Sequence, residues 1–224
     1  EILLLIGNAD RIEQLDLTTS ANTIFTTTRI NGTVNRLLAR DPADGSIYMA
    51  EQIAATSTVE KYNSQGTPMG APFINSTTGS CTLNTPTGMT VITTTGNLAV
   101  LQNNRLLIYN STGTCLASVT AAPLNANTPY AIAYHPQTDR LLVGFAGNSQ
   151  IHSCNVSGAG CSSIYNNITI VSVPRSIAVD ADGAIFVGSS GTDTVEKFTW
   201  SGVGQMVRTG TIPFISPGIH TQNP

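Results

Sequence analysis

The turn sequence Asn110-Ser111-Thr112-Gly113 recurs along this 224-residue chain and decides its fold. Its counterparts are Asn63-Ser64-Gln65-Gly66, Asn155-Val156-Ser157-Gly158 and Thr199-Trp200-Ser201-Gly202, and successive glycines are 47, 45 and 44 residues apart. Asn or Thr followed three residues later by Gly is typical of a type I turn closed by a residue with positive φ, which connects the strands of a bulged β-hairpin. The sequence therefore predicts a hairpin that returns in every unit.

Two further markers follow the same period. Short apolar runs end at Ile6, Met49, Val100, Val143 and Val187. A proline opens the next apolar stretch at Pro86, Pro129, Pro174 and Pro217.

The residue before each quoted turn is Tyr62, Tyr109 or Phe198, and Cys154 takes this place before the turn at residues 155–158. Large aromatic side chains at one repeated strand position predict a core between packed sheets.

The last unit shows what one period contains. Four segments with strand patterning, residues 176–179, 184–188, 194–198 and 205–209, are separated by turn residues. No stretch has the sustained 3.6-residue periodicity and the caps of a helix. Four short strands in a period of about 44 residues are the signature of a β-propeller blade.

We therefore expect an all-β fold, a β-propeller of about five four-stranded blades that forms a single domain over residues 1–224. The expected blades are residues 1–30 with 217–224, 31–78, 86–121, 129–170 and 174–215. The C-terminal segment would complete the first blade, which lacks a strand before Ile2, and this would close the ring and remove two open sheet edges. The alternative is an arc of a six- to eight-bladed ring.

The last unit also carries a family resemblance. Residues 174–188, followed by residues 193–198, resemble an NHL repeat, and residues 134–143 are similar to the related YVTN repeat. The resemblance covers all five units loosely and one unit closely. It implies the propeller fold and does not choose a function, because these families include lyases, lactonases, RNA-binding platforms, scaffolds and surface-layer proteins.

The cysteines and the composition point to a compartment. Four cysteines, few lysines and many Thr, Ser and Asn residues indicate a secreted protein, extracellular or on the cell surface. Cys154 and Cys161 flank the turn at residues 155–158, so we expect a disulfide across that hairpin. Cys81 and Cys115 remain for a second disulfide. The alternative is that all four are free buried thiols, which would indicate a reducing compartment.

Charge and hydropathy limit the partners. A net charge of −3 and only 10% charged residues provide no broad basic field, so we expect no nucleic-acid partner. The longest uninterrupted apolar run, Ile2–Ile6, is far shorter than the roughly 20 residues of a membrane helix, so we expect no membrane insertion.

The sequence predicts no catalytic residue, no metal ligand and no cofactor. The loops expected on the top face, which join the second strand to the third and one blade to the next, carry three acids: Asp10, Glu51 and Asp193. A lactonase-type calcium site would need more oxygen ligands converging on the channel. The other clustered acids are expected to cap their own turns: Asp41, Asp44, Asp139, Asp180 and Asp182. The histidines have no zinc-type spacing: His135, His152 and His220.

The resulting hypothesis is a non-catalytic binding, adhesion or structural assembly module. A protein or glycan ligand would contact the top-face loops, above all the insertion at residues 75–88 that stretches one period to 51. The first alternative is a lactonase-like propeller hydrolase or lyase with a site in the central channel. The second alternative is a glycan-binding lectin, although the single tryptophan, Trp200, lies on a turn at the bottom edge.

Overall fold

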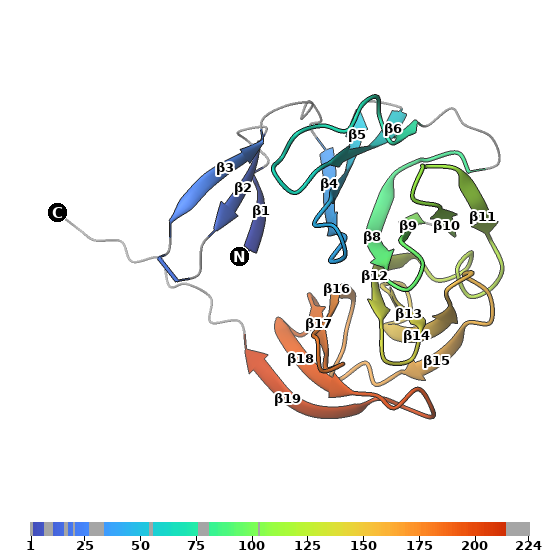
Figure 1. Ribbon diagram of the computed structural model, residues 1–224. Coiled ribbons are helices and arrows are strands. Elements are labelled where there is room, and N and C mark those ends of the chain that lie inside the picture. The colour runs from blue at the N-terminus through green and yellow to red at the C-terminus, as the bar shows by residue number, and fades with distance from the viewer. Residues whose placement is uncertain are drawn as a thin grey trace.

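The computed structural model describes residues 2–6, 11–15, 18–19, 21–26, 34–53, 56–75, 81–102 and 104–213. Every regular element in this part of the chain is a β-strand, and the strands form five antiparallel sheets whose order follows the sequence (Figure 1). No helix in the described part is long and apolar enough to cross a membrane. The all-β prediction is therefore confirmed.

The five sheets correspond to the five sequence units. The first contains β1 (Ile2–Ile6), β2 (Arg11–Leu15) and β3 (Asn22–Thr26). The second contains β4 (Val34–Arg40), β5 (Ile47–Ile53), β6 (Thr56–Tyr62) and β7 (Ile74–Asn75). The third contains β8 (Pro86–Ile92), β9 (Asn97–Gln102), β10 (Arg105–Tyr109) and β11 (Cys115–Val119). The fourth contains β12 (Pro129–His135), β13 (Arg140–Phe145), β14 (Gln150–Asn155) and β15 (Ser162–Tyr165). The fifth contains β16 (Pro174–Val179), β17 (Ile185–Ser189), β18 (Thr194–Thr199) and β19 (Val207–Pro213).

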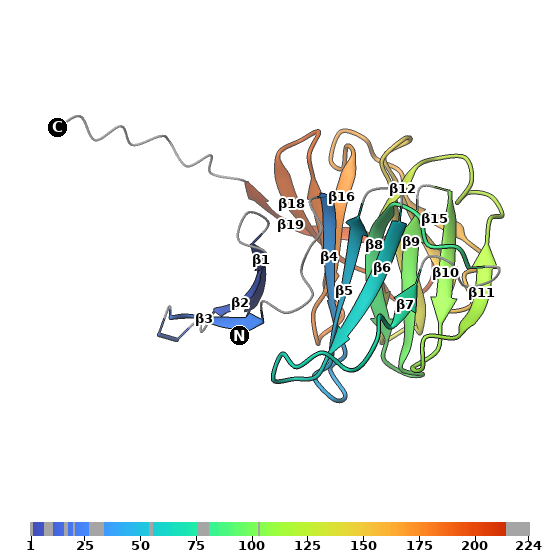
Figure 2. The ribbon, with the colours of Figure 1, turned by 90° about the horizontal axis from the view of Figure 1, so that it is seen from above.

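The four-stranded sheets are arranged as propeller blades. The innermost strands β4, β8, β12 and β16 are neighbours around a common axis, and β11, β15 and β19 lie on the outside (Figures 1 and 2). Three of the inner strands begin with Pro86, Pro129 or Pro174, and the strand register shifts directly after each proline. A proline is tolerated there because the first residue of a strand need not donate a ladder hydrogen bond.

The repeated turns have the predicted geometry. Gly66, Gly113, Gly158 and Gly202 have φ angles of 81°, 81°, 82° and 90°. The amide of Gly113 donates to the carbonyl oxygen of Asn110 at 3.0 Å. The Asn110 side chain then caps the turn, since its Oδ1 accepts hydrogen bonds from the amides of Thr112 and Thr114. Glycine is required at the last turn position because it adopts a positive φ at low cost.

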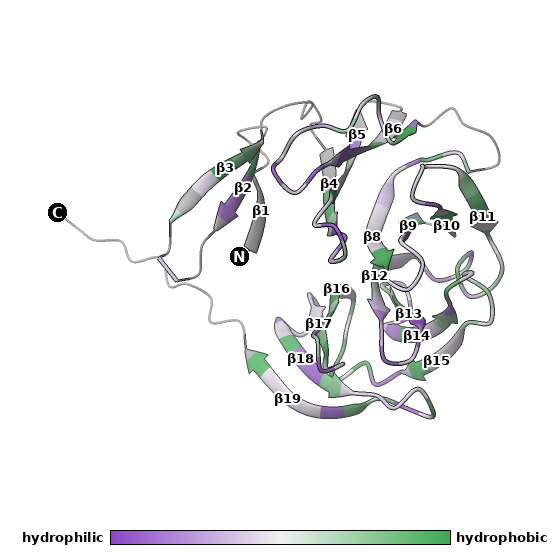
Figure 3. Ribbon diagram, in the orientation of Figure 1, coloured by the Kyte–Doolittle hydropathy of each residue, from purple (hydrophilic) through white to green (hydrophobic). Residues whose placement is uncertain are grey.

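The core lies between neighbouring blades. The repeated residues before the turns are 0% exposed, namely Tyr62, Tyr109, Cys154 and Phe198, which confirms their predicted place in the inter-sheet core. Each joins a cluster formed by strands of two adjacent sheets. Interior strands such as β10 are strongly hydrophobic, whereas the connecting turns are mostly polar (Figure 3). Burial of this alternating pattern holds each blade against the next.

The first unit departs from the prediction. It forms a three-stranded sheet, with Ile12 and Phe25 packed against Ile47, Met49 and Tyr62 of the second sheet. Its expected fourth strand, at residues 217–224, lies outside the described residues. The described chain therefore contains four four-stranded blades rather than five, and ring closure is not shown. The reason is that this unit supplies only three strands of its own, so that a fourth must come from a distant segment.

Candidate functional site

The inner strands surround a central cavity of about 690 Å³. It opens where these strands run into the turns that join each first strand to its second. The wall is made by residues 38–40, 89–91, 132–134 and 177–181, with Pro42, Thr93 and Pro136. The size is that of a small-ligand site, and we call this space the central cavity.

Most side chains of the central cavity are alkyl groups, such as those of Met89, Ile132 and Ala178, and Arg40 adds a guanidinium to the wall. Asp180 is the carboxylate in its wall, and its Oδ1 already accepts hydrogen bonds from the amides of Asp182 and Ala184, at 3.1 and 2.7 Å. This carboxylate therefore stabilises its own turn. The wall offers hydrophobic contact more than acid–base chemistry.

Tyr134 is the phenol in the same wall. Its hydroxyl donates to Asp139 Oδ1 at 2.8 Å, and Thr94 Oγ1 lies 3.0 Å from the same oxygen. Burial raises the pKa of Tyr134, and the adjacent Asp139 carboxylate adds to this effect. Tyr134 is therefore protonated at neutral pH and donates within its own blade, whereas Thr94 of the preceding blade donates to the same carboxylate and links the two blades.

The clustered acids have three different roles. Asp41, Asp44 and Asp180 cap their own turns by accepting backbone amide hydrogen bonds, as predicted. Asp139 instead bonds across the blade interface to Thr94, because its turn lies against the preceding blade. Asp182 lines a separate pocket between the last two blades.

The acids expected on the top face do not form a metal site within the described residues. Glu51 is buried on β5, at 1% exposure, whereas Asp193 is exposed and has a φ of 52° in the turn before β18. Asp10 lies outside the described residues. No group of three or more His, Cys, Asp or Glu side chains in the described part could hold a metal ion.

Two of the three histidines are described, and both are buried. His135 Nε2 lies 3.2 Å from the carbonyl oxygen of Gly183, and its ring meets Trp200 edge to face. His152 packs against Phe145 in the same manner. Burial lowers the pKa of both imidazoles, so they are neutral at pH 7. His220 lies outside the described residues.

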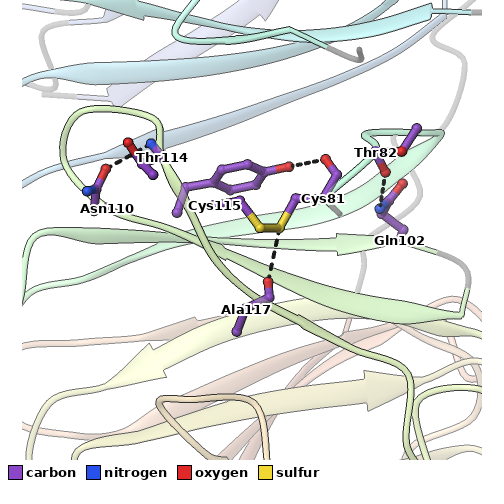
Figure 4. The surroundings of a disulfide bond; sticks show 8 residues. Cys81, Thr82, Gln102, Asn110, Thr114, Cys115 and Ala117 are labelled. Atoms are coloured by element: carbon purple, nitrogen blue, oxygen red, sulfur yellow. Dashed lines mark hydrogen bonds between the residues drawn. A yellow bond between two sulfur atoms is a disulfide. The ribbon is translucent and has the colours of Figure 1, made fainter. Parts of the chain in front are cut away.

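The structure contains two disulfides, Cys154–Cys161 and Cys81–Cys115. The first crosses the fourth hairpin. The second joins the segment before β8 to the start of β11 (Figure 4). The described cysteines include no free thiol.

The insertion at residues 75–88 is anchored where the structure describes it. Cys81 and Leu83 are 0% exposed and belong to the core between the second and third sheets. Gln102 holds the intervening backbone, since its amide nitrogen donates to the carbonyl oxygen of Thr82 (Figure 4). Its Oε1 accepts from the amide of Asn84. Residues 81–85 are thus a fixed segment of the blade, whereas the prediction treats the whole insertion as a ligand-contacting loop.

The structure shows a buried glutamate at one repeated strand position, which the sequence analysis did not single out. Glu60 and Glu196 each stand two residues before Tyr62 or Phe198, and Glu13 stands two residues before Leu15, which lies one period of 47 residues before Tyr62. All three are at most 8% exposed. Glu196 accepts hydrogen bonds from Arg208 Nε at 2.5 Å and Thr211 Oγ1 at 2.8 Å. The repeat itself carried the signal, because the same acid recurs in register with the aromatic marker.

The last two blades enclose a second cavity, of about 360 Å³, which we call the interblade pocket. It is lined by His135, Gln137, Asp182, Gly183, Thr199, Trp200, Ser201, Gln205 and Val207. These residues come from three turns at the bottom of the propeller. Most of these residues carry polar groups, but the surface of this pocket, like that of the central cavity, is more apolar than polar.

Several solved protein structures have the same fold as this chain. No protein-family model and no curated protein matches the chain. A solved streptogramin B lyase structure is similar over 96% of this chain and 65% of the lyase chain, with 16% identity and a TM-score of 0.67. A chain of a nidogen/laminin complex is similar over 84% of this chain and 70% of its own, also with 16% identity and a TM-score of 0.67. Virginiamycin B lyase from Staphylococcus aureus is similar over 93% of this chain and 64% of its own, with 14% identity and a TM-score of 0.63.

These neighbours differ in what they do, and the identities are too low to carry activity across. The chain spans less than two thirds of both lyase chains. The NHL or YVTN resemblance has no matching family model behind it. What the comparisons establish is the architecture: this chain has a β-propeller fold with four-stranded blades.

Proposed function

We propose that the protein is a non-catalytic, extracellular β-propeller that acts as a binding or adhesion module. The observation that carries this proposal is the composition of the central cavity. Most side chains of its wall are alkyl groups, its cation is Arg40, and its Asp180 carboxylate is engaged by its own turn. A wall of this kind favours apolar contact or simple packing over proton transfer or metal binding.

Two findings support the extracellular location. Both cysteine pairs form disulfides in the structure, and disulfides persist in oxidising compartments. A chain of the nidogen/laminin complex shares the fold. Thiol titration of the purified, unfolded protein tests this proposal: we expect no reactive thiol before reduction and four afterwards. Four reactive thiols in the unreduced protein would overturn it.

The ligand of the module is expected to be a protein or glycan bound on the top-face loops. The loop between β15 and β16 presents Ile168 with 60% of its side chain exposed. An exposed apolar side chain on a loop between rigid strands is a suitable contact for a partner. We expect Ile168→Asp to weaken binding without changing the fold. Met69, which is 53% exposed in the connection between β6 and β7, provides the matched control Met69→Asp.

The experiment is a binding screen with the oxidised protein on immobilised laminin, collagen, fibronectin and a glycan array. Saturable binding to one of these probes that is weakened by Ile168→Asp and not by Met69→Asp would support the proposal. Absence of binding to every probe would contradict it.

The alternative function is a lyase or hydrolase with its site in the central channel, and the fold of the two lyase neighbours favours it. It is tested by assaying lactone hydrolysis and lyase turnover with and without Ca²⁺ or Mg²⁺. Ala178 lies in the cavity wall, so Ala178→Arg should abolish such turnover. That result would show that the protein is an enzyme and would overturn the binding-module proposal.

We also propose that the first sheet, completed by residues 217–224, covers the free face of the last blade. Phe186, Val195 and Ile212 lie on that face, and Ile212 is 56% exposed. In the preceding blade the equivalents of Phe186 and Val195 are Leu142 and Ile151, which are 0% exposed. An apolar face of this composition supports the presence of a covering blade.

Replacing an apolar residue by lysine tests this closure. If the face is covered, Ile212→Lys lowers the thermal unfolding midpoint. Leu116, 55% exposed on the outer strand β11, gives the control Leu116→Lys, which should have little effect. Equal midpoints for both variants would contradict ring closure by the first sheet.

A further inference from the structure

The interblade pocket lies beside the one quoted turn that does not begin with Asn. In three other units the turn begins with Asn, and Asn63 and Asn110 cap it by accepting backbone hydrogen bonds. In the last unit Thr199 replaces Asn and Trp200 follows it. A departure from a locally favourable pattern is expected where a residue serves a function other than folding.

The tryptophan changes the structure of this turn. Ser64 and Ser111, at the same place in other units, are exposed, whereas Trp200 is only 9% exposed and lines the pocket. Its Nε1 donates to the carbonyl oxygen of Gly204 at 3.2 Å, so the indole closes the loop that the missing Asn would have capped. Trp200 belongs to the hydrophobic core between the last two blades, and the small part of it that stays exposed lines the pocket.

The polar groups of the pocket are held in place by the blades. Gln137 Nε2 donates to the carbonyl oxygen of Ala181 at 2.8 Å, across the blade interface. Gln205 Nε2 donates to the carbonyl oxygen of Ser163 at 3.3 Å. Each amide nitrogen therefore uses one of its two hydrogens, which leaves one N–H donor and the amide oxygen as an acceptor. Asp182 adds an exposed carboxylate to the same lining.

The lining contains no lysine and no arginine. An anionic ligand would meet the Asp182 carboxylate without a compensating cation, which disfavours phosphates and carboxylates. The pocket offers several oxygen acceptors and the hydroxyls of Thr199 and Ser201, which suit a ligand with many hydroxyl groups. Trp200 and Val207 add an apolar surface, which suits a ligand with an apolar C–H face. A cavity of about 360 Å³ is at the lower end of the range for small-ligand sites.

We propose that the interblade pocket binds a neutral carbohydrate, with one pyranose unit placed against the exposed part of Trp200 and its hydroxyls bonded to Asp182, Gln137 and Gln205. This proposal rests on the binding-module function and adds a specific site and ligand class to it. The site is at the opposite end of the blades from the top-face loops.

Trp200 supplies a direct measurement, because it is the only tryptophan in the protein. Its fluorescence is recorded while the oxidised protein is titrated with glucose, galactose, mannose, fucose and N-acetylglucosamine at millimolar concentrations. We expect a saturable change with at least one of these sugars. Asp182→Asn keeps the size of the side chain and removes its charge, and we expect it to raise the Kd about tenfold.

The matched control is Asp193→Asn, which alters an exposed aspartate at the other end of the same blade. It should leave the Kd unchanged, and Gln205→Ala should weaken binding as Asp182→Asn does. Circular dichroism and urea unfolding check that each variant is folded.

Three results would overturn the proposal: no fluorescence change with any sugar, an unchanged Kd in Asp182→Asn, or a response to choline without a response to neutral sugars. The last result would assign a cationic ligand to the pocket. Failure here is distinguishable from failure of the binding module, because binding that depends on Ile168 at the top face would persist.

Discussion

The hydroxyl group of Tyr109 donates a hydrogen bond of 2.9 Å to the carbonyl oxygen of Cys81. Both residues are 0% exposed, so water cannot replace this bond. Tyr109, the aromatic residue before the repeated turn, thereby holds the segment that leads into its own blade.

We expect Tyr109→Phe to lower the free energy of unfolding by about 1–3 kcal/mol, because the buried carbonyl loses its partner. Urea unfolding measures this, and Tyr130→Phe, a partly exposed tyrosine, is the control. Equal losses in both variants would contradict it.

The same tyrosine predicts an alkaline effect. Burial raises the pKa of Tyr109 from 10.0 to about 12. Between these values the folded protein keeps the phenolic proton that the unfolded chain has lost, so stability falls as the pH rises from 10 towards 12. Below pH 10 this residue adds no pH dependence. We expect Tyr109→Phe to have a shallower decline in unfolding midpoint over this range, and parallel curves for variant and wild type would count against the assignment.

The two disulfides are expected to differ in their effect on stability. Cys154–Cys161 closes a loop with a sequence separation of 7, and Cys81–Cys115 one of 34. In the chain-entropy model the shorter loop contributes about 2 kcal/mol and the longer about 3–4 kcal/mol. Paired Cys→Ala variants, C154A/C161A and C81A/C115A, should follow this order in urea unfolding. The reverse order would show that native packing, and not chain entropy, dominates.

Glu196 predicts a loss of stability in acid. Burial alone raises the pKa of this carboxyl group, but hydrogen bonds from Arg208 and Thr211 outweigh burial and bring the pKa below 4.5. A carboxyl group with a lowered pKa stabilises the fold above its unfolded pKa, and this contribution disappears as the pH falls through the folded pKa. We expect Glu196→Gln to lower the thermal midpoint at pH 7 and to match the wild type at strongly acidic pH. Asp193→Asn should not reproduce this convergence.

Two glycines separate the cost of a close contact from the cost of a positive φ. A Cβ atom on Gly113, where φ is 81°, would lie 2.2 Å from the carbonyl oxygen of Phe73, which is backbone. Gly204 has a φ of 70° and no heavy atom within 4 Å of such a Cβ. Gly204→Ala should therefore cost about 1 kcal/mol from its backbone conformation alone. Gly113→Ala should cost about 3 kcal/mol or more, because the turn must shift. Chemical denaturation would detect this difference, and similar losses would mean that the turn moves freely.

Much of the fold could be predicted because its determinants are local and repeated. The Asn-x-x-Gly turns, the prolines at the inner strands and the aromatic residues before the turns each depend on a few neighbouring residues. Their recurrence turned weak signals into a blade assignment. The first sheet was less predictable, because no local pattern states which distant segment supplies a missing strand.

The candidate sites were harder to predict, since they depend on contacts between blades. Asp139 and Asp180 look alike in the sequence, yet Asp180 caps its own turn and Asp139 bonds to Thr94 of the preceding blade. Trp200 was correctly placed on a bottom turn, but its role in a pocket follows only from the neighbouring blade that carries Gln137. The repeated buried glutamates could have been found, because they recur in register with the aromatic marker.

The disulfide between Cys81 and Cys115 has a mechanical consequence. The chain between these residues contains β8, β9 and β10, so a covalent loop encloses most of one blade. A pulling force applied at the two ends of the protein would pass from one cysteine to the other and bypass this loop. Extension would stop roughly 110 Å short of the contour length of the reduced chain. In an oxidising environment one blade would therefore be shielded from tension, and a reductant would release it.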